Sequence, residues 1–166
     1  QDAQWAADAV DRFKGPDRPK EVRHPEAFHA FRTGKPEAEK LLLATCRDSE
    51  SPAFTRAGAM LALRRFLSDA SFDEARRNLD SNESVVRTAA VSKLEDLPPE
   101  RSHASLVRML GDPILAVRSE AARILSRSPT TLFEESELKL FRKVFRELKK
   151  RYEHNLDRPE SHLSLG

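Results

Sequence analysis

The same short pattern recurs three times along the chain at a spacing of 31 residues. Arg56, Arg87 and Arg118 are each followed by an alanine at the third position and a leucine at the seventh. Offsets of three, four and seven lie on one face of a helix with about 3.6 residues per turn, so each copy predicts a helix with a narrow apolar face. Because no single copy buries this face alone, the copies must stack on one another.

A second amphipathic stretch precedes each copy and ends in a polar turn. The three stretches cover 39–46, 72–79 and 102–110, and their turns contain Asp48, Asp80 and Asp112. A helix, a tight turn and a second helix at a fixed period are typical of an α-solenoid. We therefore predict an all-α superhelix of antiparallel helix pairs in which these aspartates stabilise the turns.

The pattern divides the chain into three parts. Residues 1–36 hold N-terminal helices, Ala3–Phe13 and Pro25–Arg32, with an exposed connector between them. Residues 37–130 hold the three repeats, at 37–67, 71–95 and 101–127. Residues 131–166 hold a long helix, from Leu132 to about Asn155, and a second helix start. We expect the native polypeptide to extend further, because the chain opens at Gln1 and its last helix is unfinished.

The predicted long helix has an apolar stripe and a basic face. The stripe residues follow steps of three and four: Leu138, Phe141, Phe145, Leu148 and Tyr152. The basic face comprises Lys139, Arg142, Lys143, Arg146 and Lys150. Such a face can bind phosphates or anionic lipid, but acidic residues interrupt it, and cations near a helix C-terminus are favourable in themselves. We interpret it as a solvated face and keep the binding patch as the alternative.

Charge and composition disfavour several classes of protein. The net charge is +2, made of −2 over residues 1–100 (16 basic, 18 acidic) and +4 over residues 101–166 (13 basic, 9 acidic). This excess is well below the dense basic stripe of most nucleic-acid binders. No apolar run approaches the roughly 20 residues of a transmembrane helix. The single cysteine, Cys46, excludes an internal disulfide, and its apolar neighbours predict a buried core position.

Motifs for catalysis and cofactor binding are absent from the sequence. It contains no Gly-x-Ser-x-Gly elbow, no dinucleotide-binding glycine pattern and no phosphate-binding loop. His24 and His29 are turned about 140° apart on a helix, which suits surface or cap residues better than haem ligands. We therefore predict no catalytic residue, metal site or cofactor in these 166 residues.

The repeats resemble the short form of the HEAT repeat. The clearest copy runs from Asp112 to Leu125, with Pro113, Val117, Arg118, Ala121 and Ala122 at the matching positions. The copy around Arg87 has Ser81-Asn82-Glu83 in place of the proline, and the copy around Arg56 departs most. The resemblance implies that the three arginines are structural and bond to turn carboxylates or carbonyls of the neighbouring unit.

Two further resemblances concern the ends of the chain. Residues 156–166 resemble the opening of a tetratricopeptide repeat, although the complete pattern is absent. The segments around Trp5 and Phe28 resemble the region that joins a multihaem cytochrome c domain to HEAT and tetratricopeptide repeats in exported bacterial proteins. That resemblance implies a periplasmic location, whereas the chain itself leaves the compartment open.

These observations lead to three hypotheses for the function. The first is a non-catalytic scaffold or adaptor that holds a protein partner, or a sister domain of the same polypeptide, in the groove of its second helices. The second is a nucleic-acid-binding solenoid with arginines on its concave side. The third is an accessory domain of a periplasmic multihaem redox enzyme.

Overall fold

The structure is a computed structural model that describes residue 5 and residues 24–153. Its helices are α2 (His24–Arg32), α3 (Ala38–Arg47), α4 (Ala53–Ala62), α5 (Asp69–Asn78), α6 (Ser84–Leu94), α7 (Pro99–Met109), α8 (Leu115–Leu125) and α9 (Glu135–Glu153). Two short 3-10 helices, Leu63–Arg65 and Thr130–Leu132, follow α4 and precede α9. The described residues contain no strand, so the predicted all-α superhelical class is confirmed.

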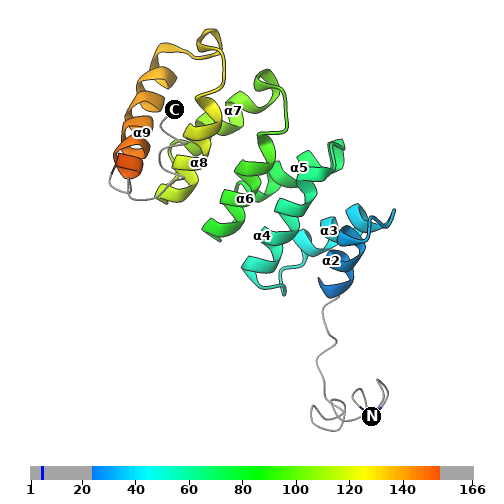
Figure 1. The fold of residues 1–166 in the computed structure, drawn as a ribbon. Coiled ribbons are helices and arrows are strands. Elements are labelled where there is room, and N and C mark those ends of the chain that lie inside the picture. The colour runs from blue at the N-terminus through cyan, green and yellow to red at the C-terminus, as the bar shows by residue number, and fades with distance from the viewer. Residues whose placement is uncertain (1–4, 6–23, 154–166) are drawn as a thin grey trace.

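The helices form two layers. The second helices of the three pairs, α4, α6 and α8, pack side by side, and α9 continues this layer beyond α8 (Figure 1). The first helices, α3, α5 and α7, form the other layer and touch each other much less than the second helices do. The continuous packing of α4, α6, α8 and α9 therefore holds successive pairs together, and α2 covers the first pair through contacts with α3 and α4.

The core follows the recurrent pattern of the sequence. The alanines three positions after the arginines, Ala59, Ala90 and Ala121, are completely buried. Leu63, Leu94 and Leu125, seven positions after the arginines, are also buried. A methyl side chain at the centre of each second helix lets the next one approach closely, while the leucines fill the space between the layers.

Local sequence accounts for the helix ends. Ser68 caps α5 by accepting a hydrogen bond from the Ser71 N–H at 3.1 Å, so α5 begins three residues before the predicted Phe72. Pro99 occupies the first turn of α7, where a missing N–H costs nothing. Helix α4, the second helix of the first pair, ends at Ala62. The residues predicted to form its last turn, Leu63–Arg65, form a 3-10 helix instead.

The long helix α9 differs from its prediction in two respects. It begins at Glu135 because Pro129 and the 3-10 helix after it occupy the start of the predicted segment. Val144 and Leu148 are buried, whereas Phe145 is 37% exposed. The buried stripe is therefore rotated toward Val144 from the predicted one.

Several predictions fall outside the described residues. These are the helix Ala3–Phe13 apart from Trp5, the connector after it, and the tetratricopeptide-like segment 156–166. His154 and His162 also lie there.

Candidate functional site

The recurrent arginines stand near the N-termini of the second helices, beside the turns that enter them. Arg87 forms two hydrogen bonds with the Asp112 carboxylate of the next repeat, from Nε at 2.7 Å and from Nη2 at 3.0 Å. Its Nη1 donates to the carbonyl oxygens of Ser81 at 2.8 Å and Asn82 at 3.2 Å. One guanidinium thus bonds its own turn and the turn of its neighbour.

Arg118 repeats this arrangement one unit later. Its Nη1 donates to the carbonyl oxygens of Asp112 at 2.8 Å and Pro113 at 3.0 Å. Its Nη2 lies 3.4 Å from Oε2 of Glu147 on α9. The partner is again a carboxylate of the next unit, held by one longer contact instead of two short ones.

Arg56 occupies the same position in the first repeat and bonds to neither group. Within the part of the chain that the structure describes, its guanidinium forms no hydrogen bond or ion pair, and its Nε is buried without a partner. Register explains the missing carboxylate, because the residue 31 positions before Asp112 is Ser81. Turn length explains the missing carbonyls, because Arg56 stands eight residues after Asp48 while Arg87 stands six after Ser81.

The turn residues keep their local role in all three repeats. Asp48, Ser81 and Asp112 each accept a hydrogen bond from the N–H two residues later, at 3.0, 3.2 and 2.8 Å. Asp80 has a different position, since its exposed carboxylate pairs with Arg108 of the third repeat at 2.7 Å. The residue equivalent to Asp112 in the second repeat is therefore Ser81, and its short side chain spans only its own turn.

Both turn aspartates are held in the ionised form. A hydrogen bond from Ser51 keeps the pKa of the Asp48 carboxyl below its usual value, and the Glu50 N–H and the charges of His24 and Arg56 add to this. Burial alone would raise the pKa of Asp112, but the hydrogen bonds and charge of Arg87 outweigh it and lower that pKa.

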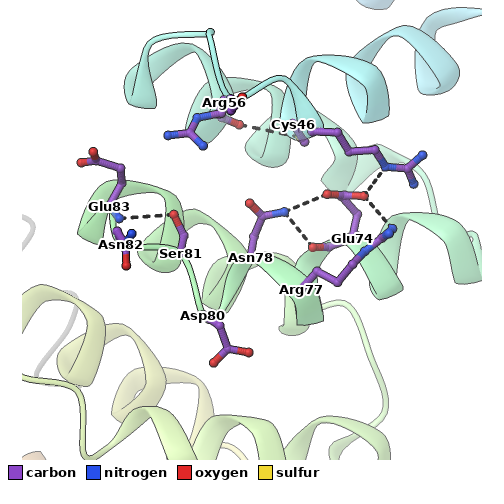
Figure 2. Close-up of a pocket in the computed structure, with 11 residues that line it drawn as sticks. Cys46, Arg56, Glu74, Arg77, Asn78, Asp80, Ser81, Asn82 and Glu83 are labelled. Atoms are coloured by element: carbon purple, nitrogen blue, oxygen red, sulfur yellow. Dashed lines mark hydrogen bonds and ion pairs between the residues drawn. The ribbon is translucent and has the colours of Figure 1, made fainter.

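A pocket of about 550 Å³ lies where Arg56 lacks its partners. It separates the α3–α4 turn from the α5–α6 turn, with Cys46, Arg47 and Arg56 on one wall and Glu74, Arg77 and residues 78–83 on the other. Figure 2 shows Arg56 on α4 across the pocket from the turn that carries Ser81, Asn82 and Glu83. The equivalent space in the next junction is occupied by the Arg87–Asp112 pair.

One wall of the pocket is built around the buried carboxylate of Glu74, which is 2% exposed. It accepts hydrogen bonds from Arg47 Nε at 2.6 Å, Arg77 Nη2 at 2.7 Å and Asn78 Nδ2 at 2.9 Å, drawn as dashed lines in Figure 2. Arg47 and Arg77 each use one N–H on Glu74. Their remaining donors stay available at the pocket mouth, because both side chains are more than half exposed.

Cys46 is buried beside the pocket, as its apolar neighbours predicted. Its thiol donates to the Arg56 carbonyl oxygen at 3.7 Å. Burial, reinforced by the charge of Glu74, raises the pKa of the thiol to about 12. The thiol therefore stays protonated at neutral pH, which is its less nucleophilic form.

A second group of polar contacts joins the repeats at the opposite ends of the second helices. Lys93 is fully buried, donates to the Phe66 carbonyl oxygen at 2.8 Å and lies 3.9 Å from the centre of the Phe72 ring. Burial lowers the pKa of Lys93, although Asp96 opposes the shift. Lys93 thus links the end of the first pair to both helices of the second.

Glu95 gathers arginines from both neighbouring repeats. It accepts from Arg64 of the first repeat at 3.1 Å and from Arg123 of the third at 2.8 and 3.0 Å. Arg127 adds a contact at 2.5 Å. Hydrogen bonds from Arg123 keep the pKa of the Glu95 carboxyl low against the opposing effect of burial.

The predicted basic face lies exposed on α9. Lys139, Arg142, Lys143, Arg146 and Lys150 share one side of the helix, and all five are exposed. Lys139 pairs with Glu135 at 2.7 Å, while the other four have no ion pair with any described residue. The solvated face and the binding patch both remain predictions.

The described histidines have structural contacts. His24 Nε2 lies 2.7 Å from the Ser51 hydroxyl, while His103 Nε2 lies 3.1 Å from Glu137 and its ring packs edge-on against Phe133. His29 is at the end of α2, in its last turn. Among the described residues no three histidine, cysteine, aspartate or glutamate side chains converge as metal ligands.

Sequence reasoning found Arg56 but missed the pocket, Glu74 and Lys93. Ser81 at the register position of Asp112 was the one available signal, because it removes a carboxylate from a repeated pair. No comparable signal marks Glu74, whose partners come from two different repeats.

Comparison of the chain with protein-family models, with curated protein sequences and with solved structures gives no match.

Proposed function

We propose that this chain is a non-catalytic scaffold that binds a protein partner, or a neighbouring domain of the same polypeptide, along its layer of second helices. The observation that carries the proposal is an exposed apolar strip on α4. Phe54 is 81% exposed and Leu61 is 48% exposed, and seven residues place them on the same face of the helix. Large apolar side chains left in water on a stacked helix are typical of a contact surface.

The charges at the C-terminal ends of α4, α6 and α8 favour a protein over a nucleic acid as the ligand there. Arg64, Arg123 and Arg127, which a phosphate backbone would need free, are engaged by Glu95. Asp96 and Glu120 add further carboxylates to that network. A surface whose cations are internally paired releases few counterions on binding, which is unfavourable for nucleic-acid affinity.

The proposal includes the HEAT-type assignment of the repeats. It is supported by stacked helix pairs whose second helices carry an arginine near the N-terminus. In two of the three repeats this arginine bonds to its own turn and to a carboxylate of the next unit. None of the described helices is long and apolar enough to cross a bilayer.

Photo-crosslinking tests the scaffold proposal. A benzophenone amino acid at position 54 or 61, introduced into the protein in its native cells, is expected to yield a discrete adduct with another protein or a linked domain. The matched control is position 73 on α5, where the Asp73 side chain is 63% exposed but lies in the other helix layer. Equal adducts from positions 54 and 73, or an adduct removed by nuclease, would contradict the proposal.

A further inference from the structure

We infer that the pocket between the first two repeats binds a carboxylate from an acidic peptide segment of a protein partner, with Arg56 as its principal contact. The inference deepens the proposed scaffold function and rests on it for the source of the carboxylate. The pocket itself is testable with isolated peptides.

The first step of the argument is the comparison of the three equivalent arginines. Arg87 faces Asp112 and Arg118 faces Glu147, so at two junctions a carboxylate of the next unit occupies the space in front of the guanidinium. At the first junction the equivalent residue is Ser81, whose hydroxyl accepts the Glu83 N–H. The position in front of Arg56 therefore suits a carboxylate, but the chain supplies none there because Ser81 replaces the aspartate.

The second step is the state of the Arg56 side chain. A guanidinium stays charged at all physiological pH values, and its fork of N–H donors matches a carboxylate in two parallel hydrogen bonds. The Arg56 Nε is removed from solvent and has no acceptor among the described residues. A buried donor without an acceptor is unfavourable, so an incoming carboxylate that accepts from Nε gains more there than at an exposed arginine.

The third step is the charge of the surrounding wall. Glu74 is neutralised by hydrogen bonds from two arginines, Arg47 and Arg77, which retain further donors at the pocket mouth. Asp80 is paired with Arg108, and Glu83 is exposed on the rim. Glu83, which forms no ion pair with any described residue, would repel a phosphate dianion more strongly than a singly charged carboxylate, so we assign the pocket to the latter.

Glu83 is the internal competitor. It lines the pocket but forms no ion pair with Arg56, and its own backbone N–H is held by Ser81. Substituting Glu83→Gln removes this charge and leaves the turn intact. If the pocket takes a carboxylate from outside, Glu83→Gln is expected to preserve peptide binding.

The binding experiment follows the Arg56 Nε–H signal by NMR in the complete chain. The probe is the capped peptide acetyl-Gly-Glu-Gly-amide, and the matching Gln peptide is the control. The matching phosphoserine peptide tests whether the pocket prefers a phosphate to a carboxylate. We expect a saturable shift with the Glu peptide and none with the Gln peptide. Arg56→Gln is expected to weaken binding, followed through neighbouring backbone signals, by about tenfold or more. Arg142→Gln, at an exposed arginine of α9, is expected to leave it unchanged.

Ser81→Asp gives the opposite test, because it supplies an internal carboxylate at the register position of Asp112. We expect it to raise the Tm by about 3 °C and to abolish peptide binding. Unchanged binding in Ser81→Asp, loss of binding in Glu83→Gln, equal binding of the Gln peptide, or tighter binding of the phosphoserine peptide would each overturn the inference.

The crosslinking and peptide experiments fail separately. If the adduct at position 54 persists while no peptide shifts the Arg56 signal, the carboxylate pocket is wrong and the scaffold proposal stands. If the Glu peptide binds as expected but position 54 gives no protein adduct, the scaffold proposal is wrong and the pocket remains as a carboxylate site.

Discussion

The junction between the first and second repeats and the junction between the second and third use the same arginine position in opposite ways. In the later junction Arg87 is bonded on both sides, to Asp112 and to its own turn. In the earlier one the Arg56 guanidinium bonds to no described residue and faces a pocket. Two differences explain this: serine replaces aspartate at position 81, and the turn before Arg56 is two residues longer. Together they leave the arginine without the partners that its equivalent has.

The earlier junction is held at the far ends of its helices and by Arg47, which bonds Glu74 beside the pocket. Lys93 donates to Phe66, and Arg64 pairs with Asp96, both across the first and second repeats. The residue equivalent to Lys93 in the next repeat, 31 positions on, is Ile124, which is buried without a comparable polar link. These contacts hold the two repeats together while the position in front of Arg56 stays open.

The largest expected difference between the two junctions is in the cost of removing the arginine. Arg87→Ala is expected to lower the free energy of unfolding by about 3 kcal/mol, because it leaves the buried Asp112 carboxylate without its bidentate partner. Arg56→Ala is expected to change it by less than about 0.5 kcal/mol. Urea denaturation of both variants measures the difference, and equal losses would show that the junctions are energetically alike.

The next effect concerns the opposite edge of the first junction. Lys93→Ala is expected to cost about 2 kcal/mol, because it leaves a cavity and removes the donor to the Phe66 carbonyl. Lys93→Met serves as the control and should cost less, since it keeps the packing volume and removes a buried charge. Thermal unfolding of the two variants checks this order, and an unaffected Lys93→Ala protein would contradict the assigned link.

Acid should weaken the junction between the second and third repeats. The pKa of Asp112 is lowered from its ordinary value of 3.8 in the folded state, so its contribution is fully present above that value and is lost as pH falls through the lower folded pKa. We expect the free energy of unfolding to fall in this window and Asp112→Asn to flatten the dependence. An unchanged pH slope in Asp112→Asn, measured by urea titrations from pH 5 downward, would contradict the pairing.

A smaller effect than those of Arg87→Ala and Lys93→Ala places the third junction between the other two. Glu147 contacts Arg118 through one 3.4 Å interaction, and its side chain is 39% exposed. Glu147→Gln is therefore expected to lower the free energy of unfolding by less than about 1 kcal/mol. Chemical denaturation at low and high salt measures this loss of free energy. A loss as large as that of Arg87→Ala would contradict the proposed order of the three junctions.

Much of the fold was predictable because its information is local and repeated. The three-, four- and seven-residue offsets place an apolar face on each second helix, and α6 has the predicted bounds Ser84–Leu94. Helix ends that depend on one cap, such as Ser68 before α5, were misplaced by a few residues. The predicted apolar stripe of α9 was wrong at one position, because Val144 and not Phe145 is buried in the core.

The candidate site was less predictable because its partners come from different repeats. Arg56 was recognised as a repeat residue, yet its lack of a partner depends on the identity of Ser81 and on the length of its own turn. Glu74 reads as an ordinary charge of an exposed helix, but its position beside Arg47 of the previous repeat buries it. Contacts of this kind follow from stacking, which composition and periodicity do not specify.

Glu95 has a mechanical consequence for the stack. One carboxylate at the end of the second repeat is bonded to arginines of the first and third, so three consecutive units share a common anchor along one edge. At the opposite edge the Arg47–Glu74 pair joins the first and second repeats alone, and Arg56 bonds to no described residue. When the two ends of the stack are pulled apart, we expect the repeats to separate first at this edge. The pocket would then widen while the contacts at the Glu95 edge and in the core persist.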